Sequence, residues 1–150
     1  MEEFAAYRCD TPLDTPLFFY HVPKTAGTTV NAVLHALARE RGRPFRMILR
    51  EIGMRERPLP PGLFRDETTL CYAGHCWFGM HREIGRPVHA CTVLREPVAR
   101  VVSEYLWRAG NRGLAASADG FRHYLDNLAM PNLATRLLAG ESEIDWRSVD

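Results

Sequence analysis

Hydrophobic and polar positions change in blocks along the chain, and the first clear block predicts a strand followed by a helix. A continuous apolar run at 17–21, LFFYH, is typical of a strand buried on both faces. A polar turn follows it. From Thr28 onward apolar side chains recur at helical spacing, and we expect this helix to run to about Arg41, where Gly42 ends it.

Two later apolar runs predict further strands, at 69–73 and at 88–94. Met47 and its neighbours form a shorter apolar group, which predicts either a strand or a helical turn. Strands that alternate with helical patterns indicate an α/β domain with a mostly parallel sheet. We expect three layers, with helices on both faces of the sheet.

Three more helices are predicted after the last strand. Pro97 suits the first turn of a helix, because a missing N–H costs nothing there. The apolar face expected for this helix consists of Val98, Val101, Val102, Tyr105 and Leu106. Ser117 is a candidate N-cap for the next helix, and a short helix is expected after Asn132, ending at Gly140.

The composition is that of an ordinary soluble domain. An apolar content of 46% and a charged content of 25% suffice for one hydrophobic core, and a net charge of +1 gives no general attraction to nucleic acid or to a membrane. No apolar stretch approaches the roughly 20 residues of a membrane span. We expect residues 1–16 to be an irregular lead-in and residues 17–150 to form the α/β domain.

The four cysteines favour a reducing compartment. None belongs to a C-x-x-C pair, and Cys71 and Cys91 lie within apolar runs, which predicts buried free thiols. The N-terminal sequence MEEFAAYRCD is acidic and has no apolar core of the kind that a secretory signal requires. These features favour a cytoplasmic location.

The turn after the first strand has the composition of an anion-binding loop. Ligands of open parallel sheets bind beyond the carboxyl ends of the strands. The small residues Ala26 and Gly27 allow backbone N–H groups to approach an anion, and the helix that follows adds partial positive charge. Lys24, the only lysine in the chain, adds a mobile charge. Three threonines add hydroxyl donors: Thr25, Thr28 and Thr29.

This loop is not a Walker A sequence, because Lys24 precedes Gly27 instead of following the second glycine. Its sequence, HVPKTAGTT at 21–29, instead resembles the cofactor loop of the sulfotransferases that use 3′-phosphoadenosine 5′-phosphosulfate (PAPS). The likeness is to the branch related to the Golgi carbohydrate sulfotransferases and their bacterial relatives. The resemblance implies that residues 24–29 hold the 5′-phosphosulfate. A plain strand–turn–helix and a nucleotide-binding loop without sulfuryl chemistry are the alternatives.

A second segment supports the same resemblance. The sequence TVLREPVARVVSEY at 92–105 is similar to the family's strand–[RK]-[DE]-P-x-x-R-x-x-S signature, in which an arginine and a serine bind the 3′-phosphate. The matching positions are Arg95 and Ser103. Arg100 is interpreted as a structural, ion-pairing residue. Two separate anion sites suit PAPS better than ATP, and no aspartate ends a predicted strand as a Walker B residue would.

Sulfuryl transfer to a hydroxyl needs a general base and a cation near the leaving oxygen. Lys24 is the candidate cation, and no metal is expected. His75, in the sequence AGHCWFG, resembles the catalytic histidine of the uronyl 2-O-sulfotransferases and their relatives. His81 is a weaker alternative base or an acceptor contact, and His21 is expected to be structural, forming a hydrogen bond to the turn.

A third segment, NLATRLLAG at 132–140, is similar to one near the active cleft of these enzymes. Asn132 is thus a candidate substrate contact and Arg136 a candidate contact to the acceptor or cofactor; the alternative is that Asn132 caps its helix and the segment only packs. Family domains are longer, and the resemblance implies either a domain truncated at its C-terminus or a reduced form. The predicted function is an O-sulfotransferase that transfers a sulfuryl group from PAPS to a hydroxyl acceptor such as a saccharide and releases PAP. The alternatives are an ATP-binding protein and a small-molecule kinase.

Overall fold

Strands and helices alternate as the sequence predicts. The computed structural model of the protein describes residues 15–48 and 61–139. In chain order its elements are β1 (Leu17–Tyr20), α1 (Gly27–Glu40), β2 (Phe45–Ile48), β3 (Cys71–Gly74), the 3₁₀ helix η1 (Met80–Ile84), β4 (His89–Thr92), α2 (Pro97–Asn111), α3 (Ala118–Asn127) and α4 (Leu133–Ala139). The apolar group around Met47 is therefore a strand.

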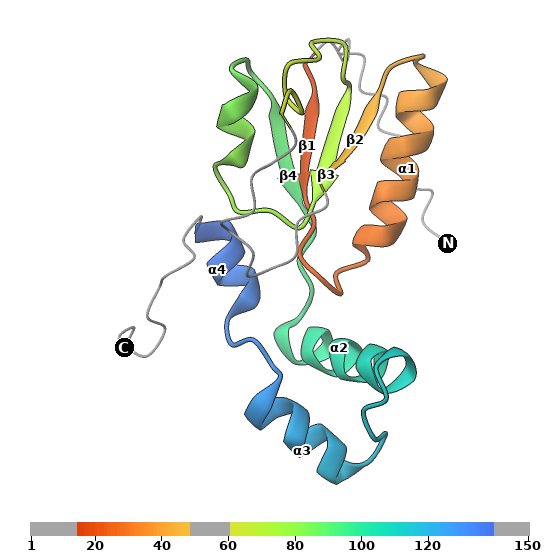
Figure 1. Ribbon diagram of the computed structural model, residues 1–150, viewed down its shortest axis with the longest axis vertical. Helices are drawn as coiled ribbons and strands as arrows, with labels where there is room; N and C mark the ends of the chain where they lie inside the picture. The colour runs from red at the N-terminus through yellow and green to blue at the C-terminus, as the bar shows by residue number, and fades with distance from the viewer. Residues whose placement is uncertain (1–14, 49–60, 140–150) are drawn as a thin grey trace, which may run out of the picture.

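The four strands form one parallel sheet in the order β2-β3-β1-β4. Its register places Tyr20, the last residue of β1, opposite Gly74 of β3 and Thr92 of β4. The carboxyl ends of these three strands therefore form one row at the lower edge of the sheet in Figure 1. The segments that follow β1, β3 and β4 consequently start side by side, although they are far apart in the sequence.

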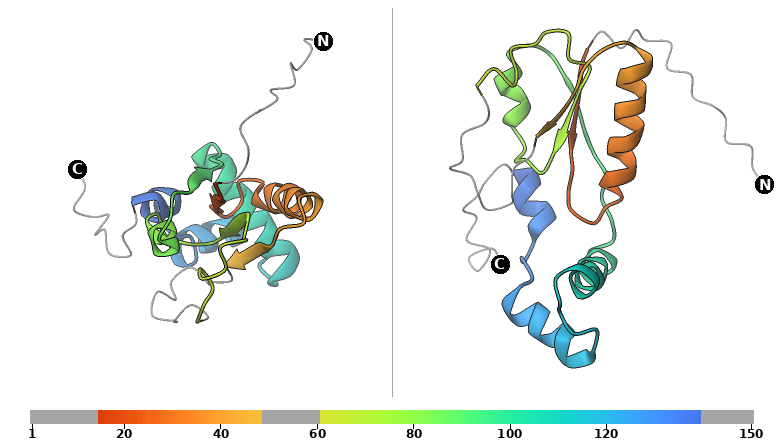
Figure 2. Two further views of the ribbon diagram at one scale, coloured as in Figure 1. Left: turned by 90° about the horizontal axis from the view of Figure 1, so that it is seen from above. Right: turned by 45° about the vertical axis from the view of Figure 1, so that its right-hand side comes forward.

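Helices cover both faces of the sheet, which confirms the three-layer α/β/α prediction (Figure 2). Alternate residues of β1 point to opposite faces, as the period of a strand requires. Phe19 faces α1 and contacts a cluster that includes Leu34 and Ala38, whereas Phe18 faces η1 and α4. The cluster around Phe18 includes Tyr72, Met80, Ile84, Leu133 and Leu137.

The helices α2 and α3 lie beyond the carboxyl ends of the strands instead of on a face of the sheet (Figure 1). They pack on each other through Tyr105, whose ring centroid lies 4.9 Å from that of Phe121 and 5.9 Å from that of Tyr124. Ser117 caps α3, as predicted, by accepting a hydrogen bond of 3.0 Å from the N–H of Gly120. Both helices therefore lie below the edge of the sheet where the strand ends meet, as Figure 1 is drawn.

The buried side of α2 differs from the apolar face predicted for it. Val98, Val102 and Leu106 are exposed, with 67%, 36% and 58% of their surface accessible. The buried residues of this helix are Arg100, Glu104 and Tyr105. The prediction fails because α2 turns the side carrying Tyr105 toward α3, and an Arg–Glu ion pair can be buried there. The interpretation of Arg100 as an ion-pairing residue is confirmed by its 2.9 Å bridge to Glu104.

The expectation of a buried Cys91 is also wrong. This residue lies in β4, an edge strand whose residues are mostly exposed, whereas Cys71 and Cys76 are buried and form no disulfide, as predicted. Cys9, nearly all of the predicted lead-in and the predicted helix end at Gly140 lie outside the described residues. Within residues 15–48 and 61–139, no helix has both the length and the apolar character that crossing a membrane requires.

Candidate functional site

The loop between β1 and α1 has the backbone of an anion-binding cradle. Lys24 and Ala26 both adopt left-handed conformations, with φ of 68° and 64°. Such conformations in non-glycine residues are uncommon, and alternating hands of the backbone turn successive N–H groups toward one point. Ala26 is the N-cap of α1, and no side chain caps this helix. The positive end of α1 is therefore directed at the space enclosed by the loop.

The amides at the start of α1 divide into two groups. The N–H groups of Thr29 and Val30 donate to the carbonyl of Ala26, at 3.0 and 3.2 Å. Those of Gly27 and Thr28 have no partner within the part of the chain that the structure describes. Two donors at a helix N-terminus without protein partners suit an anionic oxygen.

Two of the three loop threonines do not face the cradle. The Thr25 hydroxyl is buried and donates to the carbonyl of Val22 at 2.8 Å, which stabilises the turn. Thr28 lines the pocket formed by the loop, whereas Thr25 and Thr29 do not. The predicted hydroxyl contact is thus placed at the pocket only for Thr28.

His21 occupies a different place from the one predicted. Its imidazole makes no hydrogen bond to any described residue; it stacks on Phe19 and lies against His75, with ring centroids 4.4 Å apart. The ring fills the space beside Gly27, where an added Cβ would lie 1.9 Å from the His21 Cδ2 atom. A glycine at position 27 therefore leaves room for the imidazole of His21. The expected hydrogen bond to the turn is incorrect, because the ring points into the pocket.

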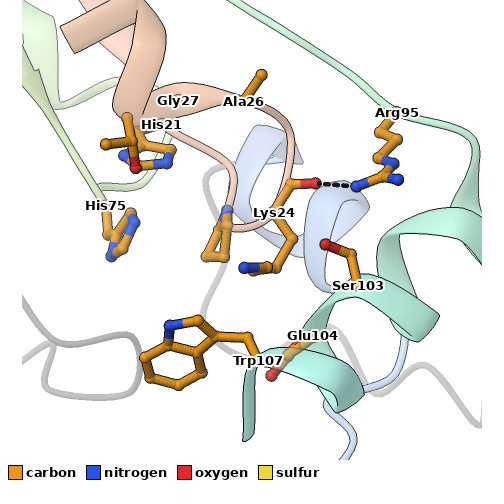
Figure 3. A pocket seen from close by; sticks show the side chains of 11 residues that line it. His21, Lys24, Ala26, Gly27, His75, Arg95, Ser103, Glu104 and Trp107 are labelled. Carbon is orange, nitrogen blue, oxygen red and sulfur yellow. Dashed lines mark hydrogen bonds between the residues drawn. The ribbon is translucent and has the colours of Figure 1, made fainter. Parts of the chain in front are cut away.

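His75 follows β3 directly and lines the same pocket (Figure 3). Burial lowers its pKa below the ordinary value of 6.5. The pKa of His21 is lowered to about 4, first by burial and then by the proximity of His75. Both imidazoles are consequently neutral at neutral pH, which is the state that a general base requires.

Arg95 reaches the cradle from the segment after β4. Its guanidinium donates to the carbonyl oxygen of Lys24 at 3.4 Å (Figure 3). The next residue, Glu96, caps α2 by accepting hydrogen bonds from the N–H groups of Val98 and Ala99, at 2.9 and 2.6 Å. The R-E-P sequence thus has a local explanation: the glutamate caps, Pro97 begins the helix and the arginine is left at the pocket.

The helix α2 contributes three more residues to the pocket: Ser103, Glu104 and Trp107. The sequence prediction included Ser103 but missed the other two, although the step of four residues from Ser103 to Trp107 places both on one face of a helix. Glu104 accepts from Arg100 at 2.9 Å and from Arg108 at 3.0 Å. Two guanidinium groups therefore offset its carboxylate charge beside a site suited to an anion.

Together these residues enclose a pocket of about 520 Å³, within the range of roughly 300–1,000 Å³ typical of small-molecule sites. It is lined by His21, Pro23, Lys24, Ala26, Gly27, Thr28, His75, Arg95, Ser103, Glu104 and Trp107. Figure 3 shows Lys24 between the two histidines and α2. Both predicted anion contacts, Lys24 and Arg95, thus line one pocket, and the predicted base, His75, lines it too.

Three predicted substrate residues lie outside this pocket. His81, on η1, is bonded to the hydroxyl of Tyr20 and packs against the rings of Phe18 and Phe78, so its position is explained by the core. Asn132 lines a neighbouring cavity of about 630 Å³ that shares Arg95 with the pocket. Arg136 lies on α4 and lines neither space. Of these three residues, Asn132 is the one that shares a cavity with a residue of the pocket.

The pocket's charges favour an anionic ligand and a proton acceptor at its wall. Lys24, Arg95 and the N-terminus of α1 are positive, and the neutral imidazole of His75 can take a proton. The described residues contain no group of three or more histidine, cysteine, aspartate or glutamate residues suited to a metal ion. No protein-family model matches this sequence, and no curated protein sequence matches it either.

Proposed function

We propose that this protein is a PAPS-dependent O-sulfotransferase that acts on a hydroxyl-bearing acceptor such as a saccharide. The proposal is carried by one observation: Lys24, His75, Arg95 and Ser103, which come from four separate segments, line the same pocket. A nucleotide with anionic groups at two positions requires two positive sites that one bound molecule can reach at the same time. A general base beside the first of them suits transfer to a hydroxyl.

The residues at the loop suit a phosphosulfate. The backbone of the loop is left-handed at Lys24 and Ala26. Its donors are the amides of Gly27 and Thr28 and the ammonium of Lys24, and none of them has an acceptor among the described residues. At the other wall Arg95 offers a planar fork to phosphate oxygens, and Ser103 adds a hydroxyl. Bound here, PAPS would supply the sulfuryl group that is transferred.

The pocket residues divide the catalytic work between them. His75 takes the proton of the acceptor hydroxyl while the hydroxyl oxygen forms its bond to sulfur. Lys24 and the α1 amides stabilise the negative charge that grows on the phosphate oxygen as its bond to sulfur breaks. His21, which contacts His75, and Trp107 form further parts of the pocket wall. The products are the sulfated acceptor and PAP.

Thermal unfolding with PAP and with ATP·Mg²⁺ tests the proposal. Saturation at about 100 times Kd stabilises a protein by about 2.7 kcal/mol. We expect PAP to raise the Tm of the wild type, and Lys24→Ala to reduce that rise. Arg122→Gln is the matched control, because it also removes one positive charge but at an exposed site on α3.

The two nucleotides separate the proposed function from its alternatives. Stabilisation by ATP·Mg²⁺ with no response to PAP would indicate a nucleotide-binding protein or a kinase. A response to PAP that is equal in the wild type and in Lys24→Ala would remove the cradle from the binding site. A panel of hydroxyl acceptors, scored by PAPS consumption, then identifies the acceptor class.

A further inference from the structure

The ammonium group of Lys24 lies over an aromatic ring instead of beside an acid. Its Nζ atom is 5.7 Å from the centroid of the Trp107 ring, within the distance of a cation–π interaction. Within the described residues no carboxylate forms a salt bridge with Lys24. Figure 3 shows the lysine side chain extending from the loop toward the indole. The contact therefore joins the cradle to α2.

Both ends of this contact are fixed by their backbones. Lys24 has a positive φ, and its carbonyl accepts a hydrogen bond from Arg95. Trp107 is on a regular helix, four residues after Ser103, so its position relative to the second anion contact is set by helix geometry. The long lysine stem is the flexible part of the contact, and a free lysine side chain loses considerable entropy when it is ordered.

We propose that Trp107 is a positioning residue that holds the Lys24 ammonium inside the pocket before an anion binds. The inference deepens the proposed function and rests on it, because an ordered ammonium matters only if Lys24 serves the transferred group. An anion in the cradle attracts the ammonium by charge, which is stronger than its attraction to a ring face. Binding thus moves a lysine that is already ordered, and the ordering cost is not incurred at that moment.

The single lysine of the chain makes the contact directly observable. Protein labelled with ¹³C at the lysine ε-carbon gives one lysine side-chain signal, which belongs to Lys24. An indole face shifts nearby protons upfield. We expect the ε-protons of the ligand-free wild type to lie upfield of their ordinary position, and PAP to move them. Trp107→Leu should return the signal to its ordinary position, and Trp107→Phe should keep part of the shift.

Affinity provides a second, independent measurement. Losing the order of one flexible side chain should weaken PAP binding roughly 2- to 10-fold in Trp107→Leu, with Trp107→Phe close to the wild type. The loss should disappear in a protein that already carries Lys24→Met, because the indole acts through the ammonium. Leu106→Ala, next along α2 and exposed, and Arg112→Gln, which removes the other cation at 5.6 Å from the ring, are matched controls.

The outcomes distinguish the two proposals. An ε-signal at the same position in the wild type and in Trp107→Leu overturns the role of Trp107, whatever PAP does. Equal loss of affinity from Trp107→Leu with and without the Lys24→Met substitution also overturns it, since that pattern is general damage to α2. If the wild type shows the upfield signal but PAP neither binds nor moves it, the contact is real and the sulfotransferase function fails instead.

Discussion

Replacing Gly27 by alanine tests the geometry of the site at its tightest point. The new Cβ would lie 1.9 Å from Cδ2 and 2.0 Å from Nε2 of His21, distances that no packed structure tolerates. The backbone of Gly27 is not in the left-handed region, so the alanine itself is not strained. Any loss of stability from the substitution should therefore arise from the imidazole, which is confined between Phe19 and His75.

The expected size of the effect follows from what must move. His21 can leave only by losing its contact with His75 or by shifting the loop, and overpacking of this kind costs about 1–3 kcal/mol. For a chain of this length each kcal/mol lowers Tm by about 2–4 °C. We therefore expect Gly27→Ala to lower Tm by roughly 2–12 °C and to weaken PAP binding as well.

Urea unfolding of a double-mutant cycle with His21→Ala supplies the measurement. Once the ring is gone, the second substitution should add almost nothing, which gives a coupling of at least about 1 kcal/mol between the two positions. Gly110→Ala is the control, because a Cβ there meets nothing within 4 Å and helix propensity alone should stabilise the protein by roughly 0.5–1 kcal/mol. Additive losses from Gly27→Ala and His21→Ala would refute the steric argument.

Three further predictions concern the base, pH and a helix cap. His75→Ala should keep PAP affinity and lower kcat by about 10²- to 10⁴-fold, and unchanged turnover would exclude it as the base. The folded-state pKa of His21 is about 4, so below its unfolded pKa of 6.5 the unfolded chain binds more protons. Stability should thus fall as the pH drops from about 6.5 toward 4, and His21→Phe should flatten this slope in urea titrations; an unchanged slope would assign it to other groups. Glu96→Ala removes the α2 cap and should cost about 0.5–2 kcal/mol, against no change for the exposed Glu67→Ala.

The local elements of this fold could be predicted because each has a short-range cause. A continuous apolar run predicts β1. Gly42 predicts where α1 ends, and Ser117 predicts where α3 begins. The cradle was predicted on the same basis, since a turn of small residues between a strand and a helix determines where backbone N–H groups point. Such signals lie within a few residues of the structure they specify.

The remaining parts depend on how distant elements pack. Cys91 is exposed because β4 is an edge strand, and a strand order cannot be read from an apolar run. Glu104 and Trp107 reach the pocket because α2 lies beyond the strand ends, with its Tyr105 side toward α3. The contact between His21 and His75 needs β1 and β3 to be neighbours, so neither sequence segment contains it.

The parallel register explains why one pocket can combine these parts. Tyr20, Gly74 and Thr92 end their strands in one row, so the segments that follow β3 and β4 each begin one strand spacing from the segment that follows β1. The next residues, however, carry different chemistry: a cationic loop after β1, an imidazole after β3 and a guanidinium after β4.

The same pocket contains one negative group, and its partners explain how an anion site can tolerate it. Glu104 lies between Arg100 and Arg108, and the Arg100 bridge is buried with side-chain exposures of 7% and 12%. Because water screens such a pair poorly, removing both arginines would leave an uncompensated carboxylate at the wall of the pocket. The two arginines therefore offset the one carboxylate among the lining residues, which leaves Lys24 and Arg95 as the lining cations that no salt bridge within the described residues neutralises.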